Sequence, residues 1–148
     1  MPSRSRRAND RGRKVSAASP ERLTGRCNCG AVSFSAGGPF REPVACHCKS
    51  CRRQSGHYLA ATRVRQADLD VSGETAITWY AATPKARRGF CATCGAHLFW
   101  RENGADMVSI YAGCLDEPTG LALAEHIYVA EKGDYYDIAD ALPQRPER

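Results

Sequence analysis

Long hydrophobic runs are missing from this sequence of 148 residues, in which no stretch approaches the roughly 18 consecutive apolar residues of a membrane-spanning helix. The first twenty residues also lack the apolar segment of a secretory signal. Arg6-Arg7 is followed by Ala8, Asn9 and Asp10, which is not a twin-arginine signal. We therefore expect a cytoplasmic protein without a membrane partner.

Helical periodicity is scarce as well, since no 12-residue amphipathic period can be recognised. Short segments with two-residue alternation, separated by Gly and Pro, instead predict a mainly β domain built of hairpins. Residues 133–142 are expected to form a closing strand or a short helix. The predicted strands are 31–35, 58–64, 76–80, 97–100, 107–111 and 126–129.

The net charge of +5 is unevenly placed along the chain. Residues 1–26 hold eight Lys/Arg and two acidic residues, whereas residues 27–148 hold thirteen and fourteen. The domain itself is therefore nearly neutral, which does not favour a nucleic-acid-binding fold. We expect residues 1–22 to be a disordered basic arm, 23–142 the folded domain and 143–148 a tail. The arm can be read as a solvated tail, an organellar transit peptide or a contact for nucleic acid.

Eight cysteines are the strongest signal, and in a reducing compartment they favour metal binding over disulfides. Cys91 and Cys94, followed by Gly95, have the spacing of a zinc knuckle, and no βαβ pattern supports the alternative of a redox pair. Cys27 and Cys29 are closer together and can reach one ion only if the chain bends there. The two pairs together would supply the four thiolates of a structural zinc site.

Three further cysteines, Cys46, Cys48 and Cys51, lie within six residues. Three thiolates leave one tetrahedral position of zinc free, as in a reactive site. The alternative is a second structural zinc that is closed by His47, His57 or Cys114. The ring of His47 is expected to point away, because this residue lies between two cysteine ligands.

A zinc ion with three thiolates suits an incoming sulfur ligand, which the metal would hold as a thiolate at neutral pH. No HExxH helix, Ser-His-Asp candidate or phosphate-binding glycine loop competes with this reading. Arg52-Arg53 follows the three-cysteine segment, and Arg87-Arg88 precedes the CxxC pair. These cations would offset thiolate charge or bind an anionic substrate, or else they are exposed on loops.

These segments resemble the glutathione-dependent formaldehyde-activating enzyme family, which includes the centromere protein V-type domains. The resemblance covers roughly residues 23–138, with seven cysteines at three characteristic spacings in order. Its motifs are GRCNCGAVSF at 25–34, CHCKSCRR with SG at 46–56, FCATCGAHLF at 90–99, and GCLDEP with HIYV at 113–129.

The resemblance implies a small Mss4-like (β-tent) fold of short antiparallel strands with two zinc ions per chain. It implies a carbon–sulfur lyase that forms S-hydroxymethylglutathione from glutathione and formaldehyde. The implied structural zinc ligands are Cys27, Cys29, Cys91 and Cys94, and the implied catalytic zinc ligands are Cys46, Cys48 and Cys51.

The expected reaction joins the sulfur of glutathione, or of a similar thiol, to the carbonyl carbon of formaldehyde or a related small carbonyl. The candidate proton shuttles are His47, His57 and His97. The candidate contacts for the carboxylates of glutathione are Arg52, Arg53 and Gln54.

Cys114 stands where the family signature would have a small hydroxyl or similar residue. It is either an inert buried thiol or a fourth ligand that closes the three-cysteine site. The alternative function is a non-catalytic zinc-binding interaction module whose basic arm contacts nucleic acid, and its test is salt-dependent binding. Exposed strand edges are compatible with a homodimer.

Overall fold

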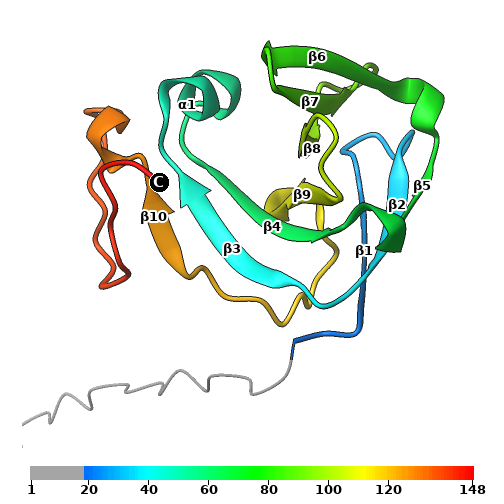
Figure 1. The fold of residues 1–148 in the computed structure, drawn as a ribbon, viewed down its shortest axis with the longest axis horizontal. Coiled ribbons are helices and arrows are strands. Elements are labelled where there is room, and N and C mark those ends of the chain that lie inside the picture. The colour runs from blue at the N-terminus through cyan, green and yellow to red at the C-terminus, as the bar shows by residue number, and fades with distance from the viewer. Residues whose placement is uncertain (1–18) are drawn as a thin grey trace, which may run out of the picture.

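A computed structural model describes residues 19–148, whose strands form two β-sheets (Figure 1). The smaller sheet has three strands in the order β1-β2-β5, all paired antiparallel. Alternation in β2 turns Phe34 and Ala36 inward, because successive side chains of a strand point to opposite faces. The bounds are β1 Arg22–Arg26, β2 Ser33–Gly37 and β5 Leu69–Ser72.

The larger sheet has seven strands in the order β10-β3-β4-β9-β8-β7-β6 and curves from β10 on the left of Figure 1 to β6 at the upper right. Its pairings are antiparallel except for β10 with β3, which is parallel. The mainly β fold predicted from the sequence is confirmed. The bounds are β3 Arg41–Cys46, β4 Leu59–Arg65, β6 Ile77–Thr83, β7 Ala86–Cys91, β8 His97–Glu102, β9 Met107–Tyr111 and β10 Glu125–Ile127.

The hydrophobic core lies between the two sheets. Phe34 of β2 meets Phe99 of β8 edge to face, with ring centroids 5.2 Å apart. Val64, Leu98 and Ile110 are fully buried in the same cluster. One face of the larger sheet is therefore covered by the smaller sheet, and its other face is turned toward helix α1.

Helix α1 (Lys49–Ser55) lies at the top of Figure 1, between the two ends of the curved sheet. Cys48 caps its first turn and Gly56 ends it with a left-handed backbone, φ 81°. Seven residues are too few to show a helical period, so the sequence did not predict this helix. No helix among residues 19–148 is long and apolar enough to cross a membrane. The short 3-10 helices are η1 Gln66–Asp68, η2 Glu74–Ala76, η3 Ala112–Cys114 and η4 Val129–Glu131.

Residues 133–142 form neither the closing strand nor the short helix that was expected, and that expectation was wrong. The segment that pairs with β10 comes later, where His126 N–H donates to the Pro143 carbonyl and Arg145 N–H donates to the His126 carbonyl. Residues 133–142 are instead fixed by side chains. Tyr135, for example, donates from its hydroxyl to the Gly56 carbonyl over 2.7 Å.

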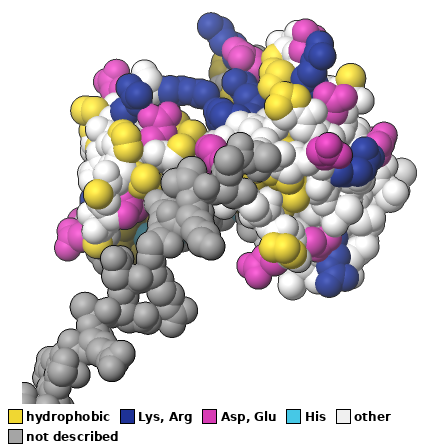
Figure 2. Space-filling model, turned by 90° about the horizontal axis from the view of Figure 1, so that it is seen from below, with side chains coloured by type: hydrophobic (Ala, Val, Ile, Leu, Met, Phe, Trp, Pro, Cys, Tyr) yellow, Lys and Arg dark blue, Asp and Glu magenta, His cyan; other side chains and the backbone are white. Residues whose placement is uncertain are grey.

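Residues close to both predicted domain boundaries take part in β pairing. Arg22 opens β1, and Gln144 forms a bridge with His126. Residues 1–18 of the predicted arm lie outside the described residues. Acidic and basic side chains are interspersed over the face in Figure 2, with basic ones gathered along its upper edge, in keeping with the near balance of charge in residues 27–148.

Candidate functional site

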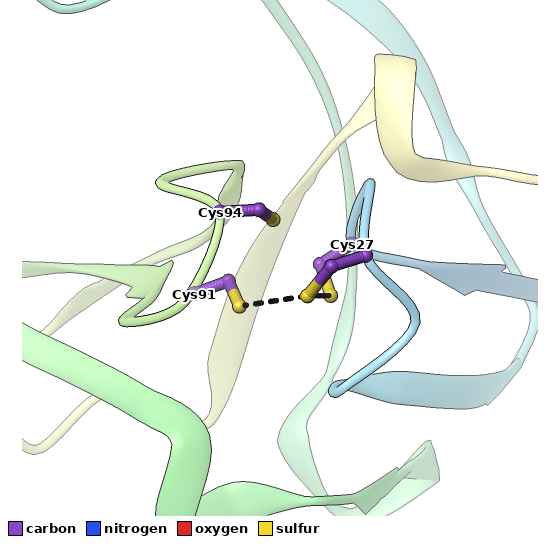
Figure 3. A group of neighbouring side chains, drawn as sticks. Cys27, Cys91 and Cys94 are labelled. Carbon is purple, nitrogen blue, oxygen red and sulfur yellow. Dashed lines mark hydrogen bonds between the residues drawn. The ribbon is translucent and has the colours of Figure 1, made fainter.

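Four cysteines from two distant parts of the chain meet at one point. Cys27 and Cys29 come from the loop after β1, whereas Cys91 ends β7 and Cys94 lies in the turn before β8, facing Cys27 (Figure 3). Sulfur atoms are 3.6 Å apart between Cys27 and Cys29 and 3.7 Å apart between Cys29 and Cys91. Tetrahedral zinc with bonds of about 2.3 Å places its sulfurs about 3.8 Å apart, so the spacing fits this ion.

Two tight turns aim these sulfurs. Cys27 N–H donates to the Val32 carbonyl, and Gly30 in between has φ 81°, which provides the bend that the CxC pair requires. Gly95 has φ 75° and supplies the equivalent bend after Cys94. Backbone N–H groups of Ala96 and Cys29 lower the pKa of Cys94 to about 6. These two N–H groups, one from each loop, therefore favour the thiolate form of Cys94, the form that binds metal.

The second group consists of Cys46, Cys48 and Cys51, whose sulfurs lie within 4.8 Å of one another. Cys46 ends β3, Cys48 caps α1, and Cys51 is buried in the first turn of that helix. Cys51 N–H donates to the Cys48 sulfur over 3.4 Å. Within residues 19–148 no fourth His, Cys, Asp or Glu joins this group, so it offers three ligand atoms, one fewer than the other group.

The pKa values of the thiols in this group are shifted in opposite directions. The thiols of Cys46 and Cys51, together with backbone N–H groups of the helix start, lower the pKa of Cys48. The contacts with Cys48 and Cys51, followed by burial, raise the pKa of Cys46. Cys48 is therefore the first of the three to carry a negative charge, and the group needs a cation before all three can be thiolates.

Arg88 of β7 supplies a cation beside this group. Its side chain is 5% exposed, and one Nη lies 3.4 Å from the Cys51 sulfur and 3.1 Å from the Ser50 hydroxyl. Its other Nη donates to the Tyr111 hydroxyl over 2.8 Å. The sequence associated Arg87-Arg88 with Cys91, but folding brings Arg88 to the three-cysteine group, whereas neighbouring Arg87 lies 6.0 Å from the Trp79 ring.

Tyr111 is a functional candidate that the sequence analysis missed. Burial raises its pKa, so the hydroxyl remains a proton donor at neutral pH. Because it accepts a hydrogen bond from Arg88, its own proton is directed elsewhere. No local motif surrounds this residue, and only its pairing in the sheet brings it near Arg88.

His47 is fully buried and points away from the sulfurs, into a chain of hydrogen bonds. Its Nδ1 meets the Tyr136 hydroxyl, and its Nε2 lies 2.9 Å from His126 Nδ1. Nε2 of His126 in turn donates to the Asp140 carboxylate over 2.9 Å. Burial and the neighbouring His126 lower the pKa of His47 to about 4. In the tautomer in which His47 accepts from Tyr136 and donates to His126, each proton in this chain points from Tyr136 toward Asp140.

Two of the other predicted site residues, Arg52 and Gln54, tie α1 to neighbouring segments. Arg52 Nε donates to the Glu131 carbonyl, and the Gln54 amide donates to the Tyr80 hydroxyl over 2.8 Å. The Arg53 side chain is exposed. His97 lies 2.9 Å from the Gln54 carbonyl through its Nε2.

Two of the remaining candidates lie apart from the three sulfurs. His57 is exposed and packs on the rings of Tyr58 and Tyr136. Cys114 donates from its thiol to the His97 carbonyl, and burial, with the charges of Cys27 and Cys94, raises its pKa to about 11. Cys114 thus stands beside the four-cysteine group as a protonated thiol.

Two cavities of ≈ 470 Å³ and ≈ 780 Å³ occur along residues 19–148, and neither has a cysteine in its lining. The larger one is bordered by Arg65, Arg87 and Arg101 at one end of the sheet.

Comparisons with known proteins agree with this geometry. An uncharacterized lyase of Schizosaccharomyces pombe is 29% identical over 119 residues, which cover 78% of this chain and 85% of the yeast protein. A crystal structure of a Rhodobacter sphaeroides protein superposes with a TM-score of 0.55 and 28% identity, covering 64% of this chain and 88% of that one. The sequence profile of the glutathione-dependent formaldehyde-activating enzymes matches residues 22–131, and the chain therefore belongs to this family.

Proposed function

We propose that this protein is a zinc-dependent carbon–sulfur lyase that interconverts a thiol plus formaldehyde, or a related small carbonyl, with their hemithioacetal adduct, which is the S-hydroxymethyl thioether for formaldehyde. Glutathione is the proposed thiol. The family description and the lyase name of the yeast relative support this reaction class.

The separation of seven cysteines into a group of four and a group of three carries the proposal. A closed set of four thiolates favours a structural zinc that ties the loop after β1 to the turn after β7. A set of three offers a coordination position that a substrate thiol can fill. Zinc bound there would keep an incoming thiol deprotonated at neutral pH.

The chain's own residues would prepare this position in two ways. Arg88 places a permanent positive charge against Cys51, which offsets the charge of the thiolates. The buried chain from His47 to Asp140 anchors the peptide between Cys46 and Cys48, so that both sulfurs are held by a rigid backbone. We assign His47 this anchoring role because both of its ring nitrogens have protein partners.

Tyr111 is the proposed donor to the reacting oxygen. When sulfur attacks the carbonyl carbon, a carbon–sulfur bond forms and the π electrons move to oxygen, which then takes a proton. The proton given up by the thiol balances this step. A hydroxyl that is hydrogen-bonded to Arg88 is well suited to stabilise such an oxyanion.

The first test is the metal content per chain, together with a glutathione titration, in the wild type and in Cys48→Ser. We expect two zinc ions in the wild type, one in a folded Cys48→Ser variant, and loss of glutathione binding with the second ion. Cys114→Ser is the matched control, since it removes a thiol outside both groups and should keep two ions.

Formaldehyde consumption is then measured against the uncatalysed reaction of glutathione with formaldehyde. Acceleration by the wild type that Cys48→Ser lacks supports the lyase. Two bound zinc ions with no response to glutathione would contradict the proposal.

A further inference from the structure

Two arginines, Arg41 of β3 and Arg63 of β4, stand directly opposite each other in the larger sheet. Both are half-buried, and the Nε atom of each is buried without a hydrogen-bond partner among residues 19–148. Neither forms an ion pair with a carboxylate in the described part of the chain. Arg41 is held in place by one bond, from Nη2 to the Ala61 carbonyl over 3.0 Å.

This arrangement is unfavourable for the protein alone. Buried donors without partners and adjacent like charges each destabilise a fold. Burial, followed by the charges of Arg148 and Arg63, lowers the pKa of Arg41. The nearby carboxylate of Glu125 is already engaged by Arg145. An anion from outside would satisfy both guanidinium groups at once.

The pair lies on the same face of the sheet as the catalytic candidates. Residues directly opposite in an antiparallel pair share a face, and Cys46 is opposite Leu59. Every second side chain of a strand lies on the same face, so this face of β4 carries Leu59, Ala61 and Arg63. Tyr111 is opposite Ala61 and belongs to it as well.

A β-bulge in β3 puts Arg41 there. Arg41 is five residues from Cys46, and an odd separation in a regular strand would turn it to the opposite face. The register shifts between Arg41 and Val44, which adds one residue on the β3 side. Bulges commonly re-aim a side chain near a functional site, and this one brings a second guanidinium beside Arg63.

The spacing along β4 matches a peptide-sized ligand. From Leu59, beside Cys46, to Arg63 is four residues, or about 13 Å of strand. An extended tripeptide spans roughly 10 Å from end to end, and the thiol of glutathione is on its central residue, so either carboxylate lies about half that length of backbone away from the residue that carries the sulfur. The flexible side chains of the cysteine and of the two arginines would cover the remaining distance. A thiol that reaches from the three-cysteine group to this pair is therefore of peptide size and carries a carboxylate at its far end.

We propose that Arg41 and Arg63 form a carboxylate-binding site that recognises the far end of a tripeptide-sized thiol substrate. This inference rests on the proposed function for the thiol end of the ligand. It replaces Arg52 and Arg53 as the principal carboxylate contacts, since Arg52 is engaged by a backbone carbonyl and Arg53 is exposed on α1.

The test compares three probes by calorimetry on the zinc-loaded protein: glutathione, its diethyl ester without free carboxylates, and S-methylglutathione without a free thiol. Arg63→Gln and Arg41→Gln are each expected to weaken glutathione and S-methylglutathione at least about tenfold, the scale of one charge-assisted hydrogen bond. Binding of the diester should not change. Arg87→Gln, which removes an equal charge beside Trp79, is the matched control.

Folding is checked in the same variants by thermal unfolding. Loss of an unpaired, half-buried cation should leave the melting temperature unchanged or raise it, and Arg63→Lys should restore part of the affinity. Glutathione and S-methylglutathione binding that is indifferent to Arg41→Gln and Arg63→Gln would overturn the carboxylate site, even if the thiol site holds. Loss of S-methylglutathione binding in these variants would support the site, even if no thiol proved to bind zinc.

Discussion

Arg88 Nη2 lies 3.4 Å from the sulfur of Cys51, although the two residues are 37 positions apart in the sequence. Within residues 19–148 no carboxylate pairs with this buried guanidinium. The thiolates of the three-cysteine group are thus its natural counter-charge. A charge-assisted hydrogen bond of this kind both orients the sulfur and lowers its electron density.

Removal of this cation by Arg88→Met should weaken zinc binding at the three-cysteine group by about 10- to 100-fold, the range seen when partners of metal ligands are changed. The four-cysteine group should keep its ion. Competition with a chromophoric chelator gives both affinities. Arg87→Met removes an equal charge from the adjacent position and should leave both unchanged, whereas equal loss in the two variants would contradict a specific role.

Tyr111→Phe should lower kcat about 100-fold while glutathione affinity stays near that of the wild type, because the hydroxyl acts on the charge that develops at oxygen. The phenyl ring preserves the packing, so zinc content should remain at two. Initial rates at saturating glutathione, corrected for the uncatalysed reaction, provide the measurement. A rate equal to that of the wild type would remove Tyr111 from the mechanism.

The gathering of the cysteines could be expected from the sequence because the signals are local. CxC and CxxC, each followed by glycine, need particular turns, and Gly30 and Gly95 adopt them with positive φ. The three-cysteine group lies within six residues. The metal-binding roles of the two groups stay predictions that the metal analysis addresses.

The partners of these groups could not be predicted, since they depend on pairing between distant strands. Arg88 precedes Cys91 in the sequence, yet β7 carries it to Cys51 of α1. Pro43 lies where the register of β3 shifts, and prolines inside sheets occur at such bulges, but the sequence alone does not show that Arg41 then faces Arg63. The sequence analysis did not predict β3 and β7, because Pro43 and Gly89 are unfavourable residues in a strand. Gly89 has a packing role there, since a side-chain Cβ at this position would lie 3.0 Å from the ring of Trp79.

Loss of a ligand from the four-cysteine group should unfold the protein, whereas loss of one from the other group should not. We expect Cys94→Ser to lose its far-UV circular dichroism signal and its resistance to protease, because the loop after β1 is then no longer tied to the turn after β7. Cys48→Ser should keep both properties. If Cys94→Ser were as stable as Cys48→Ser, the structural role of the four-cysteine group would be disproved.

Acidification should destabilise the protein through His47. The pKa of His47 is lowered by burial to about 4, below the roughly 6.5 of an unfolded histidine, so the unfolded state binds more protons between these values. The stabilisation is complete above pH 6.5 and is lost as the pH falls toward 4, by about 1.4 kcal/mol per pH unit.

The free energy of unfolding in urea, measured with excess zinc at pH 7 and pH 5, tests this expectation. The wild type should lose about 2 kcal/mol from this residue. His57→Gln, which changes an exposed histidine whose charge is a smaller cause of the lowered pKa of His47, should lose nearly the same amount. His47→Gln should be less stable at pH 7 but lose correspondingly less on acidification, because its buried side chain cannot take up a proton. An equal loss in all three proteins would assign the acid sensitivity to the cysteine ligands, whose protonation releases the metal.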